Sequence, residues 1–225
     1  MKAERARRKS RELSPRRAPL QQRSVARNEQ ILQVTAALLD AVGFDALTTI
    51  LIAEEIGISV GTLYHYFPNK HAILYAMAER WLSEVAAALD EIDRWPLGEL
   101  SSEEFVDRLI GRQLRVYRSQ QGILHLVQAM FAVPELRELD RRHDALVIER
   151  MSRAFARYGL RGSQNELGRL GRAWLELTHA LLLVVVNQSG ARSRRTLDDL
   201  KRLGVCLIAP YLGQSPDSDV VEEPT

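Results

Sequence analysis

The chain has 225 residues, 46% of them hydrophobic and 27% charged, which is ordinary for a protein that folds in water. Its longest aliphatic run, Ala180–Val186, is far shorter than the roughly 18 residues of a membrane-spanning helix, and no apolar stretch follows the charged N-terminus as in a signal peptide. We therefore expect a soluble, cytoplasmic protein with no membrane partner. The single cysteine, Cys206, excludes an internal disulfide, and its apolar neighbours predict that it is buried.

The net charge of +2 conceals a strong asymmetry. Residues 1–27 carry ten lysines and arginines but two glutamates, a net charge of +8, so the rest of the chain carries −6. A basic arm on an acidic body predicts a polyanionic partner, most simply the phosphates of double-stranded DNA, although such an arm can also serve only solubility. Residues 1–24 lack apolar periodicity, and residues 214–225 are polar and acidic, so both ends are expected to be disordered.

The first helical patterns predict a helix-turn-helix. From about Val25 to Val42 apolar residues recur at helical spacing, and Gly43 ends that pattern. A short helix then ends at Gly57, where glycine suits a left-handed backbone, and Ser59 can cap a second short helix over Val60–Phe67. Three such helices over residues 25–70 predict a DNA-binding domain whose last helix enters the major groove.

The rest of the chain is predicted to be helical as well. Asn69 can cap a long helix from Lys70 to Ile92. Further helical patterns begin near Ser101, Ile123, Pro134, Ser163 and Arg195. The predicted fold is all-α, with an N-terminal three-helix helix-turn-helix domain joined by the long helix to a C-terminal helical domain over residues 71–213.

The segment from Leu47 to Lys70, LTTILIAEEIGISVGTLYHYFPNK, resembles the DNA-binding signature of the tetracycline-repressor (TetR) family, and the resemblance extends over residues 27–77. It implies a transcriptional regulator, most simply a ligand-responsive repressor, that binds a palindromic operator as a homodimer and takes a small hydrophobic effector in its C-terminal domain. The competing interpretation is a small-molecule-binding or scaffold protein that keeps a vestigial DNA-binding domain.

The same resemblance implies which residues contact DNA: Thr48, Thr49, Ser59, Val60, Gly61, Thr62, Tyr64, His65, Tyr66 and Lys70. Hydroxyl groups such as those of Thr62 and Tyr64 suit phosphate oxygens, whereas His65 suits a base edge. Ile50 stands where members of the family usually carry a polar or basic residue, so direct base readout is expected to be thinner here.

The C-terminal domain has a predicted dimer interface and a predicted ligand pocket. The helix that contains Ala180–Val186 is apolar on all sides, so a partner subunit would cover it, unless it is the central core helix of a monomer. The interface is predicted at Leu181, Leu182, Val185, Leu200, Leu203 and Leu207. The pocket, for which ordinary core packing is an equal alternative, is predicted at Trp81, Phe105, Tyr117, His125, Met130, Phe131, Phe155, Trp174 and His179.

Enzymatic alternatives have little support in the sequence. Gly57–Gly61 matches the G-x-S-x-G nucleophile elbow of serine hydrolases, but that turn needs a strand before it, and the preceding residues are helical in pattern. Ser59 is therefore interpreted as a helix cap. The glycine-rich nucleotide-binding motifs are absent, and none of the five histidines has an acidic residue at i, i+4, so we expect no cofactor, no metal and no catalysis.

Overall fold

The computed structural model describes residues 20–213, which are helical without a strand in that range and confirm the all-α prediction. The helices are α2 (Leu20–Ala46), α3 (Thr49–Ile56), α4 (Val60–Tyr66), α5 (Lys70–Ile92), α6 (Ser102–Ser119), α7 (Ile123–Ala132), α8 (Arg137–Tyr158), α9 (Gln164–Val186) and α10 (Gly190–Ile208), with short 3-10 turns η1 (Pro134–Leu136) and η2 (Ala209–Tyr211).

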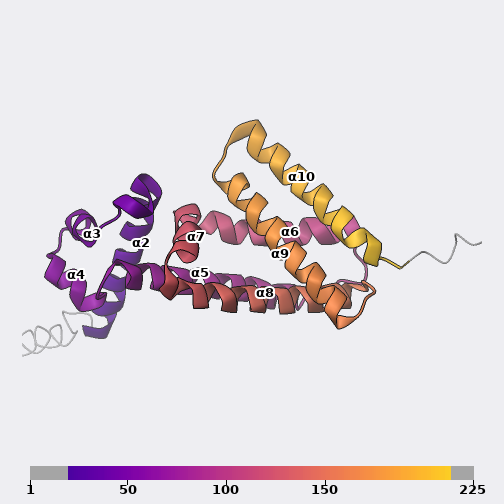
Figure 1. Ribbon diagram of the computed structural model, residues 1–225, viewed down its shortest axis with the longest axis horizontal. Helices are drawn as coiled ribbons and strands as arrows, with labels where there is room; N and C mark the ends of the chain where they lie inside the picture. The colour runs from indigo at the N-terminus through magenta and orange to yellow at the C-terminus, as the bar shows by residue number, and fades with distance from the viewer. Residues whose placement is uncertain (1–19, 214–225) are drawn as a thin grey trace, which may run out of the picture.

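Helices α2, α3 and α4 form one end of the molecule, and α5 runs from that end into the body (Figure 1). Gly43 breaks α2 with a non-helical backbone (φ 76°, ψ 176°), as its position after the apolar pattern predicted. The core of this end is small and dry, because Leu39, Leu47, Ile52 and Leu63 are fully buried. Burial of these side chains holds the short helices, which would be unstable alone.

The body is a bundle in which α5 and α8 run along one side, α10 lies on the opposite side, and α6 and α9 lie between them (Figure 1). Two glycines permit its closest helix contacts. A Cβ on Gly171 of α9 would lie 2.8 Å from the carbonyl oxygen of Ile148 in α8, and a Cβ on Gly204 of α10 would lie 2.8 Å from Cγ1 of Val106 in α6. Since α10 has neighbours on its inner side only, its outer face is left to solvent in the single chain.

The end formed by α2, α3 and α4 is joined to the body by α5 and also by α7. Gly122, at the start of α7, has a φ of 69°, and a Cβ there would lie 2.8 Å from the carbonyl oxygen of Ala36 in α2. Seven residues before Ala36 on α2, Glu29 forms a 2.5 Å ion pair with Arg80 of α5. A conformational change in the body can therefore displace α2 through its contact with α5 or through its contact with α7.

Several local predictions are confirmed and others are corrected. Asn69 caps α5 at the predicted residue, and Ser101 and Ser163 form reciprocal capping boxes. In contrast, α2 begins near residue 20 and includes residues 20–24, which were predicted to be disordered; the remainder of the predicted arm and residues 214–225 lie outside the described residues. Helix α10 begins at Gly190, five residues before the predicted Arg195. The sequence placed the start too late because the first turns of α10 are polar and show no apolar periodicity.

Two further observations concern exposure to solvent and to lipid. Cys206 was predicted to be buried but is exposed on α10 of the single chain, because the helix turns that side away from α6 and α9. None of the described helices combines the length and the apolar character needed to cross a membrane.

Candidate nucleic-acid interface

The turn between α3 and α4 is built by local hydrogen bonds. Gly57 adopts the left-handed backbone conformation (φ 75°, ψ 37°), and its N–H donates to the carbonyl oxygen of Glu54 over 3.0 Å. The hydroxyl of Ser59 then accepts from the N–H of Thr62 over 3.0 Å and starts α4. These two caps set the short turn of a helix-turn-helix, as predicted.

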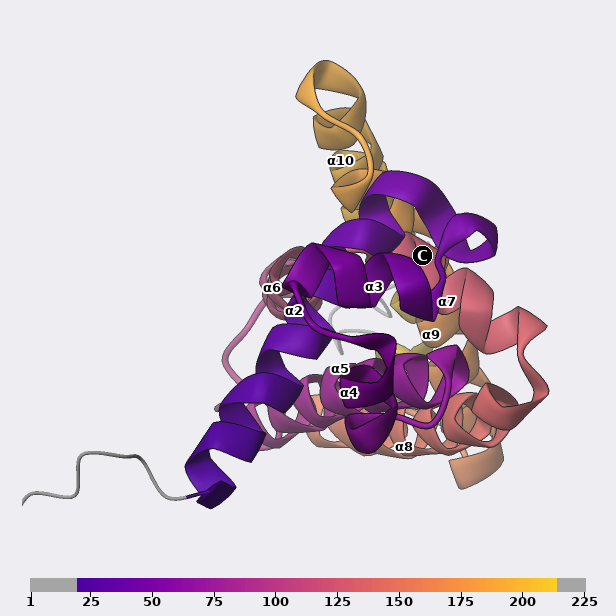
Figure 2. The same ribbon diagram turned by 90° about the vertical axis from the view of Figure 1, so that its left-hand side faces the viewer.

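Helix α4 has one buried side and one exposed side. Leu63 is fully buried and holds the helix against α3, whereas Gly61, Thr62 and His65 are exposed and Tyr64 is 49% exposed. Viewed from this end of the molecule, α3 and α4 face the viewer, and no other helix of residues 20–213 covers them (Figure 2). The exposed side of α4 is therefore accessible to a large partner.

The polar side chains on this surface are linked to one another. The hydroxyl oxygens of Thr49 and Tyr64 lie 3.2 Å apart, so a hydrogen bond joins α3 to α4 across the turn. Thr48 caps α3, because its hydroxyl accepts from the N–H of Leu51 over 3.1 Å. His65 meets Tyr66 edge to face, with ring centroids 5.4 Å apart. This network preorganises the surface, since few side chains must be ordered when a partner binds.

Lys70, the first residue of α5, is partly engaged within the protein. Its ammonium donates to the carbonyl oxygen of Phe44 over 3.1 Å and lies 4.4 Å from the centroid of the Phe44 ring. An ammonium group has three donors, so two remain for a phosphate beside the N-terminus of α5. These contacts restrict the Lys70 ammonium to one position near the surface.

Ile50 projects outward from α3 and is 56% exposed. Its surroundings offer little positive charge, because residues 48–70 contain one lysine against two glutamates. A polyanion bound here would need further positive charges from the protein. The largest group of lysines and arginines close by in the sequence is the arm of residues 1–27.

The predicted pocket residues separate into three groups. Trp81, Tyr117 and His179 lie together in the body: the Tyr117 hydroxyl is 2.6 Å from Nδ1 of His179, and the Trp81 ring lies 6.1 Å from the Tyr117 ring. Phe105, Phe155 and Trp174 form a second aromatic cluster that is fully buried core. His125, Met130 and Phe131 lie apart on α7, where Phe131 is 62% exposed and lines no interior cavity.

Beside the first group lies a cavity of about 30 Å³, which three polar residues missed by the sequence analysis help to line: Gln113, His143 and Thr178. Tyr117 also lines the cavity, and its remaining walls are aliphatic. His143 stacks on Trp81 with ring centroids 5.2 Å apart. The sequence around His143 is dominated by arginine and acidic residues, so no apolar context marked it as an interior position.

Burial governs the ionisable groups of this cavity. Burial, helped by the nearby His143, lowers the pKa of His179 to about 4, so its imidazole is neutral at physiological pH. Burial likewise raises the pKa of the Tyr117 hydroxyl. Gln113, which lines the cavity, has a buried Oε1 without a hydrogen-bond partner in the described part of the chain. The same is true of Trp81 Nε1 and His179 Nε2 in the neighbouring aromatic group.

The six predicted interface residues fall into two groups, three that are buried and three that are at least partly exposed. Leu182, Val185 and Leu200 are buried inside the single chain, so their side chains have no surface left for another subunit. Leu181 and Leu207 are half-buried, and Leu203 is 47% exposed. Of the six predicted residues, only Leu181, Leu203 and Leu207 thus keep apolar surface outside the single chain, next to the exposed Cys206.

Comparison with known proteins agrees with this geometry. Residues 31–77 match the family described as bacterial regulatory proteins, tetR family, and residues 102–206 match the tetracyclin repressor-like C-terminal domain. A transcriptional regulator from Rhodococcus has the same fold, with a TM-score of 0.65 and 14% identity over 81% of this chain and 96% of that one. A TetR-family regulator from Marinobacter aquaeolei gives a TM-score of 0.60 and 20% identity over 83% and 91%.

Two curated relatives are similar over short parts of the chain. The tetracycline repressor protein class A from Escherichia coli is 43% identical over 54 residues, which are 24% of this chain and 25% of that protein. The regulator BetI from Vibrio campbellii is 34% identical over 65 residues, 29% of this chain and 33% of that one. The chain thus spans a third or less of the length of these two relatives. Because both of its family matches fall on tetracycline-repressor domains, the chain belongs to the tetR family of bacterial regulatory proteins.

Proposed function

We propose that this chain is a transcriptional regulator that binds a palindromic DNA operator as a homodimer and represses transcription until a small hydrophobic molecule releases it. In this proposal residues 25–70 form the DNA-binding domain and residues 71–213 the effector-binding and dimerisation domain. The observation that carries the proposal is the outward-facing side of α4, whose exposed Thr62, Tyr64 and His65 lie opposite the buried Leu63.

A helix with one buried and one polar, exposed side suits the major groove of DNA. The hydroxyls of Thr49, Thr62 and Tyr64 can donate to phosphates and set the register, and His65 can reach a base edge. Ile50 adds an apolar contact of the kind that thymine methyl groups accept. Because this surface has little net positive charge, much of the affinity would come from the basic arm and would fall steeply with salt.

A mobility-shift experiment with DNA from upstream of the chain's own coding region tests the proposal. We expect a discrete complex that survives an excess of unrelated duplex, and a footprint with two half-sites about one helical turn apart. The absence of a specific complex over several upstream fragments would favour the alternative, a ligand-binding or scaffold protein with a vestigial DNA-binding domain.

Dimerisation is supported by the outer face of α9 and α10. Leu203, Cys206 and Leu207 are spaced at three- and four-residue steps on α10, so they share one side of the helix. Leu181 of α9 contributes to the same kind of surface. Two-fold pairing would cover these side chains and place two copies of α4 on one face of a duplex.

Replacing Leu203 by glutamate is expected to weaken the dimer at least about tenfold, because a charge would lose its hydration in an apolar interface. Sedimentation or light scattering over a dilution series measures the dissociation constant. Val25→Glu is the matched control, since Val25 is 63% exposed but lies on α2, away from the proposed interface. An equal response of both variants would contradict the assignment of the interface.

The effector proposal rests on the cavity beside Trp81, Tyr117 and His179. At about 30 Å³ this cavity has room for one water molecule, so a ligand must push the helices apart to enter. Gln113 Oε1, which lines the cavity and has no partner in the described part of the chain, gives a ligand one position for a hydrogen bond. Expansion would move α5, which begins at the DNA-binding end, and would thereby change the spacing of the two α4 helices.

Titration of the operator complex with hydrophobic candidate ligands tests this coupling. We expect ligands that quench tryptophan fluorescence to weaken DNA binding by about 5–150-fold. Gln113→Leu should reduce the affinity of ligands that donate a hydrogen bond, while operator binding in the absence of ligand stays unchanged. Tight ligand binding without any effect on DNA affinity would reject the coupling.

A further inference from the structure

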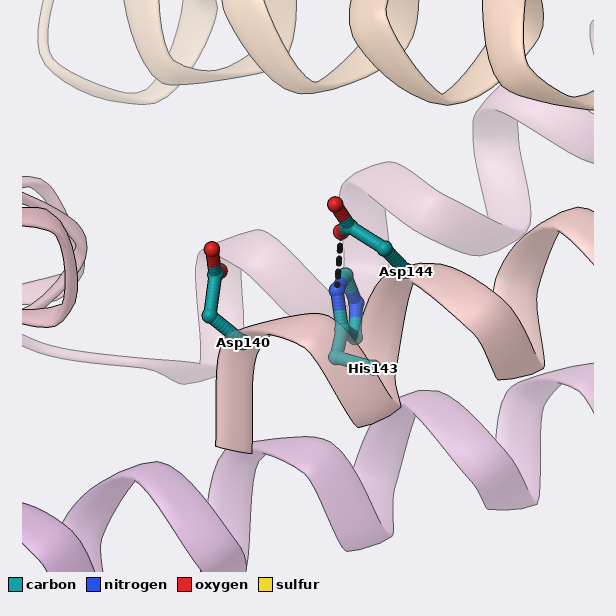
Figure 3. Close-up of side chains that lie close together, drawn as sticks. All are labelled: Asp140, His143 and Asp144. Atoms are coloured by element: carbon teal, nitrogen blue, oxygen red, sulfur yellow. Dashed lines mark hydrogen bonds and ion pairs between the residues drawn. The ribbon is translucent and has the colours of Figure 1, made fainter. Parts of the chain in front are cut away.

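The first turns of α8 bring together three side chains that can bind a metal ion. Asp140, His143 and Asp144 lie at i, i+3 and i+4 and therefore on one side of the helix. One ligand atom from each lies within 4.8 Å of those of the other two, and Nδ1 of His143 is 3.2 Å from Oδ1 of Asp144. Figure 3 shows the two carboxylates pointing to the same side of α8, with the imidazole between them.

The negative charge of this group has no strong cationic partner. Within residues 20–213 neither Asp140 nor Asp144 forms an ion pair with a lysine or arginine, and Asp144 pairs with His143 alone. Glu176 of α9 adds a further nearby negative charge. The ligand atoms of Asp140 and Asp144 lie within 4.8 Å of each other, so the like charges of the two carboxylates repel. A bound cation would relieve this repulsion.

The two histidines near the carboxylates are held in place and offer nitrogen ligands. His143 is only 6% exposed and is stacked on Trp81, so its ring cannot turn freely into solvent. His179 on α9 has its Nδ1 beside the Tyr117 hydroxyl at 2.6 Å, while its Nε2 is buried and has no partner in the described part of the chain. A metal-bound histidine characteristically donates its other ring N–H to an oxygen, and Tyr117 supplies that oxygen.

We propose that Asp140, His143 and Asp144 bind a divalent transition-metal ion such as Zn²⁺, and that His179, which lies outside this group in the single chain, joins the site from α9 when the ion binds. Two ligand atoms each about 2.1 Å from one ion are at most about 4.2 Å apart, so the α8 ligands need move by less than about 1 Å. The ion takes the place of a proton on Nδ1 of His143, and the neutral imidazole then carries its one proton on Nε2. A mixed nitrogen and oxygen ligand set favours zinc, manganese or iron over calcium.

Such an ion would tie α8 to α9 beside the cavity proposed for the effector. The proposal is independent of DNA binding, because it depends only on groups in the body and can be measured on the free protein. Unlike a patch of surface acids, the site has a buried imidazole at its base and an unpartnered nitrogen on the neighbouring helix.

The test uses the full chain, freed of metal by a chelator, with Zn²⁺ and Co²⁺ as probes. We expect saturable binding of one ion per chain by calorimetry, a rise in Tm, and a visible Co²⁺ absorption band that shows nitrogen coordination. Asp140→Asn and His143→Gln should each weaken binding at least about tenfold, and His179→Gln should weaken it and shift the Co²⁺ band. Circular dichroism checks that each variant is folded.

Glu138→Gln is the matched control, because Glu138 lies on the same helix but pairs with Arg141 at 2.6 Å. This variant should bind the ion like the original chain. Failure of the original chain to bind one ion saturably would overturn the proposal, and so would equal losses in Glu138→Gln and Asp140→Asn. Unchanged binding and an unchanged Co²⁺ band in His179→Gln would overturn the part assigned to α9.

Discussion

Tyr64→Ala is expected to lower the affinity for the operator at least about a hundredfold while leaving a folded dimer. A hydrogen bond to a charged group contributes about 1.5–3 kcal/mol, and a homodimer loses one such contact in each half-site, so the loss counts twice. The fold should tolerate the change, because Tyr64 is 49% exposed and its hydroxyl bonds only to that of Thr49. Fluorescence anisotropy with labelled operator DNA measures the affinity.

Two companion variants locate the cause of this loss. Tyr64→Phe keeps the ring and removes the hydroxyl, so it separates phosphate binding from ring contact. Phe131→Ala truncates an aromatic side chain that is 62% exposed on α7, away from α4, and should leave DNA binding unchanged. Unfolding of Tyr64→Ala would show that Tyr64 is needed for packing, and undiminished affinity would show that α4 does not read the operator through it.

Gly122→Ala is expected to reduce the free energy of unfolding by at least about 3 kcal/mol. The left-handed backbone at φ 69° costs any other residue about 1–2 kcal/mol. The added Cβ would also lie 2.8 Å from the carbonyl oxygen of Ala36, and this backbone atom cannot move aside unless α2 shifts from α7. Urea unfolding at fixed protein concentration measures the change, since subunit pairing makes stability depend on concentration.

Gly57→Ala separates backbone strain from the contact between α2 and α7. Gly57 has nearly the same conformation, with φ 75°, but a Cβ there meets nothing within 4 Å. The free energy of unfolding of Gly57→Ala should therefore fall only by the cost of backbone strain, about 1–2 kcal/mol. Equal losses of unfolding free energy in Gly122→Ala and Gly57→Ala would mean that α7 is not tightly packed against α2. The body would then act on the DNA-binding end through α5 alone.

The sequence by itself determined the helices and the turns between them, because these depend on residues a few positions apart. Gly43 and Gly57 break their helices with backbone conformations that glycine tolerates, and Ser59 and Asn69 cap the helices that follow. The long α5 begins and ends at the predicted residues. The outward side of α4 also followed from its pattern, since a single buried leucine on a short helix leaves the opposite side exposed.

Only the tertiary structure decided which residues share a core, a surface or a site. Leu182 and Leu203 are equally apolar, but the packing of α9 and α10 buries one and exposes the other. Cys206 is exposed in the single chain for the same reason. His143 and His179 come from different helices and meet around Trp81 because α5, α8 and α9 pack there. Helical periodicity gives the side of a helix on which a residue lies, but not the helix that covers that side.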